Sequence, residues 1–319
     1  MARSDLLVDL VDAEQSQDRQ RFRALVEAVI AEERAKSHHQ VADKLAGLLT
    51  TNGSARKLSA RPIAPDIEEL VAEVIPARSL ADLVLDPVVA SAAAELIQEH
   101  HRADLLRSHG LEPRHRVLLI GPPGNGKTSL AEAIATEAML PMFVARYEGI
   151  ISSFLGESAG RLHSLFEHVR SQRCILFLDE FDTIAKERAD EHETGEIKRL
   201  VSTLLLQIDR LPSYVVVVCA TNHAELLDRA TWRRFQLRLP LSPPTRTSST
   251  SFMARTESRL GKLGLSPRTI ADKLKGASYA ELEQFALDVR RKYVLDLPDA
   301  NLASIAADKI RQWQKQLQR

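Results

Sequence analysis

The stretch Gly121-Pro-Pro-Gly-Asn-Gly-Lys-Thr128 (GPPGNGKT) decides the fold, because it matches the phosphate-binding pattern G-x-x-x-x-G-K-[ST]. The short apolar run Val117–Ile120 (VLLI) comes directly before it, and a segment of helical composition, Ser129–Met139, comes directly after it. Glycines let successive backbone N–H groups point at phosphate oxygens, and the N-terminus of the following helix adds partial positive charge. The sequence therefore predicts a strand, a phosphate-binding loop and a helix.

The loop pattern predicts a task for its residues. We expect Lys127 to reach the β- and γ-phosphates of a nucleotide and Thr128 to ligate Mg²⁺. The expected ligands are therefore ATP and Mg²⁺. The residues that we expect to bind the nucleotide are consecutive in the chain: Pro122, Pro123, Gly124, Asn125, Gly126, Lys127, Thr128 and Ser129.

A second apolar run, Cys174–Leu178 (CILFL), ends in the carboxylates of Asp179 and Glu180. Open α/β sheets place their ligands at the carboxyl ends of their strands. We expect Asp179 to hold Mg²⁺ through its water shell, and Glu180 to orient and deprotonate the attacking water. An apolar strand followed by two acids is common by itself, so this prediction depends on the phosphate-binding loop upstream.

A third apolar run, Val215–Ala220, is followed by Asn222 and then by two adjacent arginines, Arg233 and Arg234. Asn222 can bridge the γ-phosphate and the attacking water, or it can simply cap a helix. The arginines are either solvated surface charge or a pair supplied to the γ-phosphate of a neighbouring subunit. The second alternative would make hydrolysis depend on assembly.

The pattern of the apolar runs indicates an α/β fold class. The runs are apolar throughout, which predicts strands buried on both faces, and helical segments between them predict a parallel sheet in a three-layer P-loop sandwich. Beyond Leu241 the strands stop, and the pattern is helical from Phe252 onward. We predict an N-terminal helical module over 1–60, a linker over 61–78, a nucleotide-binding α/β subdomain over 79–241 and an all-helical lid subdomain over 242–319.

Composition excludes some classes of protein. Lys+Arg and Asp+Glu both number 43, so the formal net charge is zero and the chain lacks the positive excess that favours nucleic-acid binding. The only cysteines, Cys174 and Cys219, lie inside apolar runs and cannot make a disulfide framework. The sequence shows neither the pattern of a signal peptide nor an uninterrupted apolar run of about 18 residues, the length needed to cross a membrane. We therefore expect a soluble, cytoplasmic protein.

Together these motifs resemble the AAA+ ATPases over about Ser79 to Leu297, with GPPGNGKT as Walker A, CILFLDE as Walker B, ATN as sensor 1 and WRRF as the arginine-finger segment. The stretch Ile151–Ser158 (ISSFLGES) is similar to the first pore loop of the branch that contains katanin, spastin and the ESCRT-disassembling ATPase. The resemblance implies a hexameric ring in which Phe154, flanked by Leu155, grips a polypeptide in the central channel. From its own surroundings, Phe154 can equally be a core anchor beneath the sheet.

The chain departs from the family pattern at several positions. Its two arginines are adjacent, whereas the common form separates them, so which one reaches the phosphate is open. Ala280 stands where other branches place a sensor 2 arginine, and no lid arginine is therefore expected in catalysis. Asp209 resembles an acid that signals between subunits, or it simply closes a helix. The segment Lys186–Glu193 resembles a second pore loop, and its alternative is a solvated helix start.

The predicted function is that of a ring-forming ATPase, a homo-oligomer that threads a polypeptide client through its pore. The alternative is an ATP-controlled switch or regulatory ATPase that acts on a partner without threading it. A separate protease is one such partner, because the chain contains neither H-E-x-x-H nor G-x-S-x-G. A clamp loader or helicase loader is disfavoured by the zero net charge, and no nucleic-acid partner is expected.

Overall fold

A computed structural model describes residues 65–146, 155–182 and 195–317. Within these residues the chain forms a six-stranded sheet in the order β1-β3-β4-β5-β2-β6. Its strands are β1 (Val71–Val74), β2 (Arg116–Ile120), β3 (Met142–Ala145), β4 (Cys174–Leu178), β5 (Val215–Thr221) and β6 (Leu237–Pro240). All neighbours pair in parallel except β1, which runs antiparallel to β3. The predicted α/β class is confirmed, with a mixed sheet in place of a purely parallel one.

The antiparallel edge strand corrects the predicted linker over 61–78. That region contains helix α4 (Pro65–Glu68) and strand β1, and Val71 of β1 pairs with Ala145 of β3. Leu70 and Val71 are each only 2% exposed. Pro65 is the first residue of α4 and Pro76 stands two residues beyond β1, and at both positions a missing N–H costs little.

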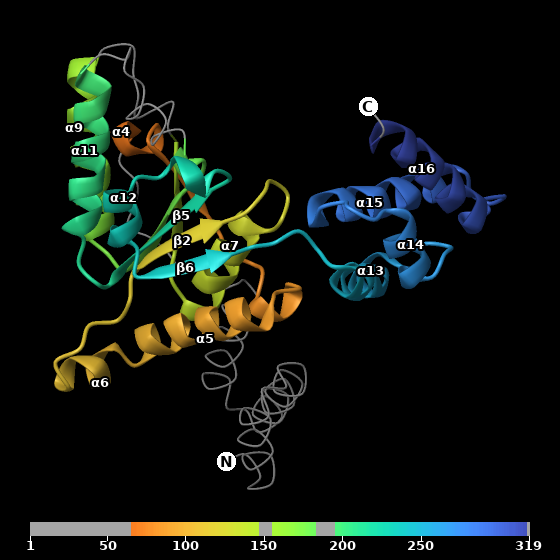
Figure 1. Cartoon of the computed structure of the whole chain (residues 1–319), viewed down its shortest axis with the longest axis horizontal. Coiled ribbons are helices and arrows are strands. Elements are labelled where there is room, and N and C mark those ends of the chain that lie inside the picture. Colours follow the sequence, from red (N-terminus) through yellow and green to blue (C-terminus); the bar gives the residue numbers. More distant parts are fainter. Residues whose placement is uncertain (1–64, 147–154, 183–194, 318–319) are drawn as a thin grey trace, which may run out of the picture. The chain divides into compact units, whose positions relative to one another are not determined.

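Alternating side chains of the central strands pack into two separate cores. Helices lie on both faces of the sheet (Figure 1). On one face, residues such as Leu118, Leu176 and Val217 pack with α4, α9 (Leu155–Arg170) and α11 (Gly195–Asp209). On the other face, Phe177 and Val218 are among those that pack with α5 (Pro87–His101) and α7 (Lys127–Ala138). This burial on both faces explains why the strands are apolar throughout.

The chain beyond the sheet is helical, as the sequence predicts. Its helices are α13 (Arg246–Leu260), α14 (Pro267–Lys273), α15 (Tyr279–Leu295) and α16 (Leu302–Leu317), and they share a core of their own. The first of them begins before the predicted start at Phe252. The side chain of Thr245, directly after Pro243 and Pro244, accepts a hydrogen bond from the N–H of Ser248. This N-cap allows the polar residues from Arg246 onward to begin the helix.

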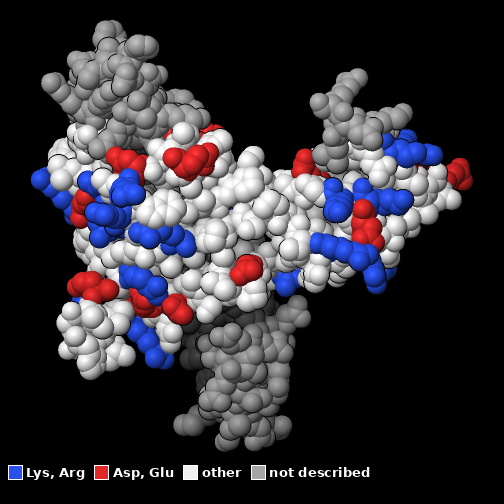
Figure 2. Space-filling view, viewed as in Figure 1, with Lys and Arg blue, Asp and Glu red and all other residues white. Residues whose placement is uncertain are grey.

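The remaining described elements are short: η1 (Leu80–Asp82), α6 (Ala103–Ser108), η2 (Ala224–Leu226) and α12 (Arg229–Arg234). Lys and Arg lie interspersed with Asp and Glu on the face shown in Figure 2, in keeping with the zero net charge. In the part of the chain that the structure describes, no helix has both the length and the apolar character needed to cross a membrane. The predicted N-terminal module over 1–60 lies outside the described residues.

Candidate nucleotide site

The predicted phosphate-binding loop joins β2 to α7 at the carboxyl edge of the sheet. Gly124 has a positive φ of 76°, and a Cβ at this position would stand 2.8 Å from the hydroxyl oxygen of Ser278. The carbonyl of Gly124 also accepts a hydrogen bond of 3.0 Å from the N–H of Ala280, at the start of α15. Glycine is needed here because the loop both turns in a left-handed conformation and closely approaches the C-terminal helices.

The amine of Lys127 lies where the loop meets the end of β5. Its Nζ donates to the carbonyls of Gly121 at 2.7 Å and Pro122 at 3.1 Å, and to Oδ1 of Asn222 at 2.6 Å. Burial lowers the pKa of Lys127, while the charges of Asp179 and Asp182 oppose that shift. The structure therefore brings Lys127 and Asn222 together, and phosphate oxygens are suitable replacements for the acceptors that now hold the amine.

The predicted acids follow β4 at the same edge of the sheet. Oγ1 of Thr128 lies 3.4 Å from Oδ2 of Asp179, so a hydroxyl and a carboxylate oxygen stand side by side at the start of α7. Such hard oxygen donors are the ligands that Mg²⁺ prefers, and these residues fit that ion. Glu180 is exposed, and its N–H donates to Oδ1 of Asp179 at 2.9 Å. Its φ of 47° is a left-handed conformation that is costly for a residue other than glycine.

Asp182 is a site residue that the sequence reasoning missed. It is 5% exposed, and its Oδ1 accepts from Oγ1 of Thr221 at 3.1 Å and from the N–H of Asn222 at 3.2 Å. The carboxylate of Asp182 therefore holds the backbone of Asn222 in place. An acid close behind Glu180 in the sequence was the available signal, but its partners on β5 are visible only in the folded chain.

Residues of the phosphate-binding loop and of the segments that follow β4 and β5 line one cleft of about 1,100 Å³. Of the residues predicted to bind the nucleotide, all but Pro122 line it, and Asp179, Glu180 and Asn222 line it with them. The residues 81–85 and side chains of α13 and α15, among them Phe252 and Tyr279, also line the cleft. The cleft thus combines polar groups suited to phosphates with aromatic and aliphatic side chains.

The two predicted arginines lie outside this cleft and differ from each other. Nε of Arg234 donates to Oδ2 of Asp209 at 2.8 Å, and its NH1 donates to the carbonyl of Ala230 at 3.0 Å. Oδ1 of Asp209 also accepts from Arg116 at 2.9 Å. Arg233 is exposed and has neither a hydrogen bond nor an ion pair to any described residue. Arg234 is therefore anchored within its own chain, whereas Arg233 is available to a partner.

An aromatic contact connects the arginine helix to the acids. The rings of Phe181 and Phe235 pack edge to face, with centroids 5.7 Å apart. Both residues are buried, one directly after Glu180 and the other directly after Arg234. This packing gives α12 a fixed position relative to the carboxyl end of β4.

The predicted pore loops lie outside the described residues. Phe154 precedes α9, and the segment Lys186–Glu193 falls between described residues 182 and 195. Leu155 is the first residue of α9, but its side chain is not described. The assignment of Phe154 and Leu155 to a substrate pore stays a prediction.

Comparisons with known proteins agree with the geometry of the cleft. The family described as "ATPase family associated with various cellular activities (AAA)" matches residues 117–243. An uncharacterized AAA family ATPase, y4kL of Sinorhizobium fredii, is 33% identical over 93% of this chain and 91% of its own length. The proteasome-activating nucleotidase of Thermococcus onnurineus is 35% identical over 63% of this chain, which spans 54% of that relative.

A solved structure has the same fold. The crystal structure of the FIGL-1 AAA domain matches with a TM-score of 0.62 and 23% identity, over 79% of this chain and 90% of that one. The same domain in complex with ADP matches with a TM-score of 0.59, over 76% of this chain and 86% of that one.

Proposed function

Because the chain belongs to the AAA family of ATPases, we propose that it hydrolyses ATP within a homo-oligomeric ring, a hexamer, and uses this cycle to pull on a polypeptide client. ATP binding and hydrolysis are the activity of the family. The observation that carries the proposal is the cleft in which Lys127, Asn222 and the acids after β4 converge. The location proposed for the ring is the cytoplasm, which is in keeping with the free, buried Cys174 and Cys219.

The residues of the cleft divide the work of hydrolysis. The loop from Pro122 to Ser129 would hold the phosphates, and Lys127 would exchange its bond to Asn222 for bonds to the β- and γ-phosphates. Thr128 and Asp179 would hold Mg²⁺, which neutralises phosphate charge when bound. Glu180 would accept a proton from the attacking water, and Asn222 would orient that water toward the γ-phosphate.

The arginines supply the argument for a ring. Consecutive residues of a helix point about 100° apart, so Arg233 and Arg234 cannot present their guanidinium groups in the same direction. Arg234 is engaged by Asp209, whereas Arg233 is exposed. We assign Arg233 to the γ-phosphate of a neighbouring subunit, and Arg234 to holding α12 in the orientation that this requires. Asp209 takes part as the acceptor that anchors Arg234.

The proposal of a polypeptide client is supported by the sequence of the chain and by the name of one relative. Phe154 and Leu155 stand in the stretch that resembles a pore loop, and one relative is named a proteasome-activating nucleotidase. The division near residue 241 between the α/β subdomain, which includes β1, and a lid over 242–319 belongs to the same proposal. It is supported by the end of β6 at Pro240 and the start of α13 at Arg246.

The second candidate is a regulatory ATPase that acts on a partner without threading it. The same relative favours it, because its name joins a nucleotidase to a separate protease complex. Phe154→Ala separates the candidates. In a threading ATPase this change abolishes unfolding of a tagged model substrate and leaves basal ATP hydrolysis intact. Unfolding that persists in Phe154→Ala would remove the pore assignment.

The ring is tested with Glu180→Gln, which we expect to bind ATP without hydrolysing it and so to trap the assembled state. Size-exclusion chromatography and negative-stain microscopy should show an oligomer only when ATP is added. Arg233→Ala should be inactive alone, and mixing it with Glu180→Gln should restore hydrolysis, because the second variant supplies an intact Arg233 to the active sites of the first. A monomer that is unchanged by ATP would contradict the ring and the task of Arg233 together.

A further inference from the structure

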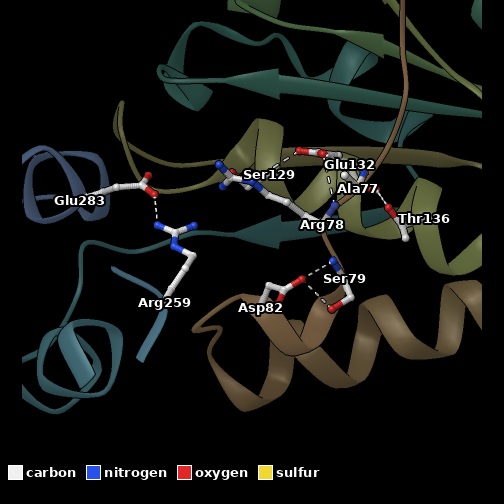
Figure 3. A network of polar contacts seen from close by, with 9 residues as sticks. All are labelled: Ala77, Arg78, Ser79, Asp82, Ser129, Glu132, Thr136, Arg259 and Glu283. Atoms are coloured by element: carbon white, nitrogen blue, oxygen red, sulfur yellow. Dashed lines mark hydrogen bonds and ion pairs between the residues drawn. The ribbon is translucent and has the colours of Figure 1, made fainter. Parts of the chain in front are cut away.

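We propose that Arg78 is a nucleotide-binding residue whose guanidinium group binds the α-phosphate of ATP and ADP. The proposal rests on the proposed function only in taking the cleft as the nucleotide site. No motif points to Arg78, which lies in the region predicted to be a linker. Figure 3 shows its side chain reaching from the segment before η1 to Ser129, at the start of α7.

The backbone around Arg78 is fixed to the helix that follows the phosphate-binding loop. The N–H groups of Ala77 and Arg78 donate to Oε1 of Glu132 at 3.0 and 3.3 Å. Leu80 donates in the same way to Oε1 of Glu137 at 2.7 Å. Both carboxylates belong to α7, which begins at Lys127. The segment therefore has a set position relative to the phosphate-binding loop (Figure 3).

The guanidinium group of Arg78 retains donors for a ligand. Its NH1 donates to Oγ of Ser129 at 2.8 Å, and its Nε lies 3.6 Å from Oε2 of Glu132, beyond hydrogen-bonding distance. The side chain is 44% exposed and lines the cleft. Its other N–H groups have no partner among the described residues. Arginine presents a planar fork of donors that suits phosphate oxygens, and such charge-assisted bonds are short and strong.

The position of Arg78 along the cleft selects the α-phosphate. The loop and Lys127 are the groups assigned to the β- and γ-phosphates, and the segment 81–85 offers the cleft aliphatic side chains that suit a base. Arg78 lines the cleft and bonds to Ser129, the last of the consecutive loop residues that line it. Because the loop and Lys127 are assigned to the β- and γ-phosphates, the α-phosphate, which is bonded to the β-phosphate, would lie next to them, beside Ser129 and Arg78.

The other arginines of the cleft bind groups that lie outside the phosphate-binding loop. NH1 of Arg255 donates to the carbonyls of Ala81 and Leu83 at 2.6 and 2.9 Å. Arg259 pairs with Glu283 at 2.5 Å, on the opposite side of the close-up in Figure 3. These contacts leave Arg78 as the cleft arginine whose contacts lead toward the phosphate-binding loop.

The test compares ligands that share or lack an α-phosphate. ATP, ADP, AMP and adenosine displace a fluorescent ADP analogue from the full chain carrying Glu180→Gln, in which turnover is blocked. Arg78→Ala should lower the affinities for ATP, ADP and AMP by a common factor of about tenfold and leave the affinity for adenosine unchanged. Arg78→Lys should lose less affinity, because lysine keeps the positive charge but not the planar set of guanidinium donors.

The matched control is Arg291→Ala. Arg291 is 62% exposed, pairs with Asp288 on α15 and does not line the cleft, so affinities should stay at the parent values. Unchanged ATP and ADP affinities in Arg78→Ala would overturn the inference, as would a loss confined to ATP or an equal loss for adenosine. If the parent chain binds neither ATP nor ADP, the proposed function itself fails, which is a distinguishable result.

Discussion

The backbone conformation of Glu180, the proposed general base, lowers the free energy of unfolding of the chain. The residue has a φ of 47°, and a left-handed conformation costs an ordinary L-residue about 1–2 kcal/mol. Asparagine tolerates this region better than glutamate or glutamine does. Because Glu180 is exposed, its replacement removes few packing contacts. We therefore expect Glu180→Asn to be more stable than Glu180→Gln by about 1 kcal/mol.

The comparison between the two amides isolates the backbone, because both variants lack the carboxylate and should have lost ATP hydrolysis. For a folded unit of this size, about 1 kcal/mol corresponds to a rise in Tm of about 2 °C. The melting temperatures are measured without nucleotide, since bound ATP would raise Tm by itself. Urea unfolding then gives the difference in unfolding free energy between the two variants. Equal unfolding free energies for the two amides would refute the reasoning.

Met139 supplies the control away from the catalytic residues. Met139 and Glu180 are the described residues other than glycine with a positive φ, which is 54° at Met139. Met139 is the C-cap of α7, and the residue is 60% exposed. Met139→Asn should gain stability of a similar size while ATP hydrolysis stays at the wild-type rate. If Met139→Asn is stabilised and Glu180→Asn is not, the strain assigned to Glu180 is absent.

Other predictions concern packing, positioning and pH. Gly121→Ala should cost about 3 kcal/mol or more in urea unfolding, because its Cβ would lie 2.1 Å from the carbonyl oxygen of Leu241; normal stability would contradict that approach. Asp182→Ala should lower single-turnover hydrolysis about tenfold through Asn222 with little change in ATP affinity, and an unchanged rate would remove its positioning task. Burial lowers the pKa of His100 below 6.5, so the unfolded chain binds the proton more readily and unfolding free energy should fall as pH drops below 6.5. His100→Asn should reduce this loss between about pH 7.5 and about pH 5.5 in urea unfolding, whereas an identical slope would show that His100 does not cause it.

Local signals in the sequence were enough for much of the fold. The strand Cys174–Leu178 has the predicted bounds, because a run that is buried on both faces must be apolar throughout. The phosphate-binding loop could also be predicted, since the residues of its pattern are adjacent in the chain and stand between a strand and a helix. Parallel strands then bring their carboxyl ends to one edge, which is why Lys127, Asp179 and Asn222 meet where the sequence placed them.

The rest depended on pairings between distant parts of the chain. Val71 lies on a strand only because Ala145 is beside it, and Arg234 is anchored only because Asp209 ends a helix nearby. Arg78 faces the cleft because acids on α7 bind the backbone of its segment. By itself, the sequence determined the phosphate-binding loop, the buried strands and the order of the acids, because each depends on adjacent residues. Only the tertiary structure decided which arginine is free and which lines the cleft, because those outcomes depend on side chains that folding brings together.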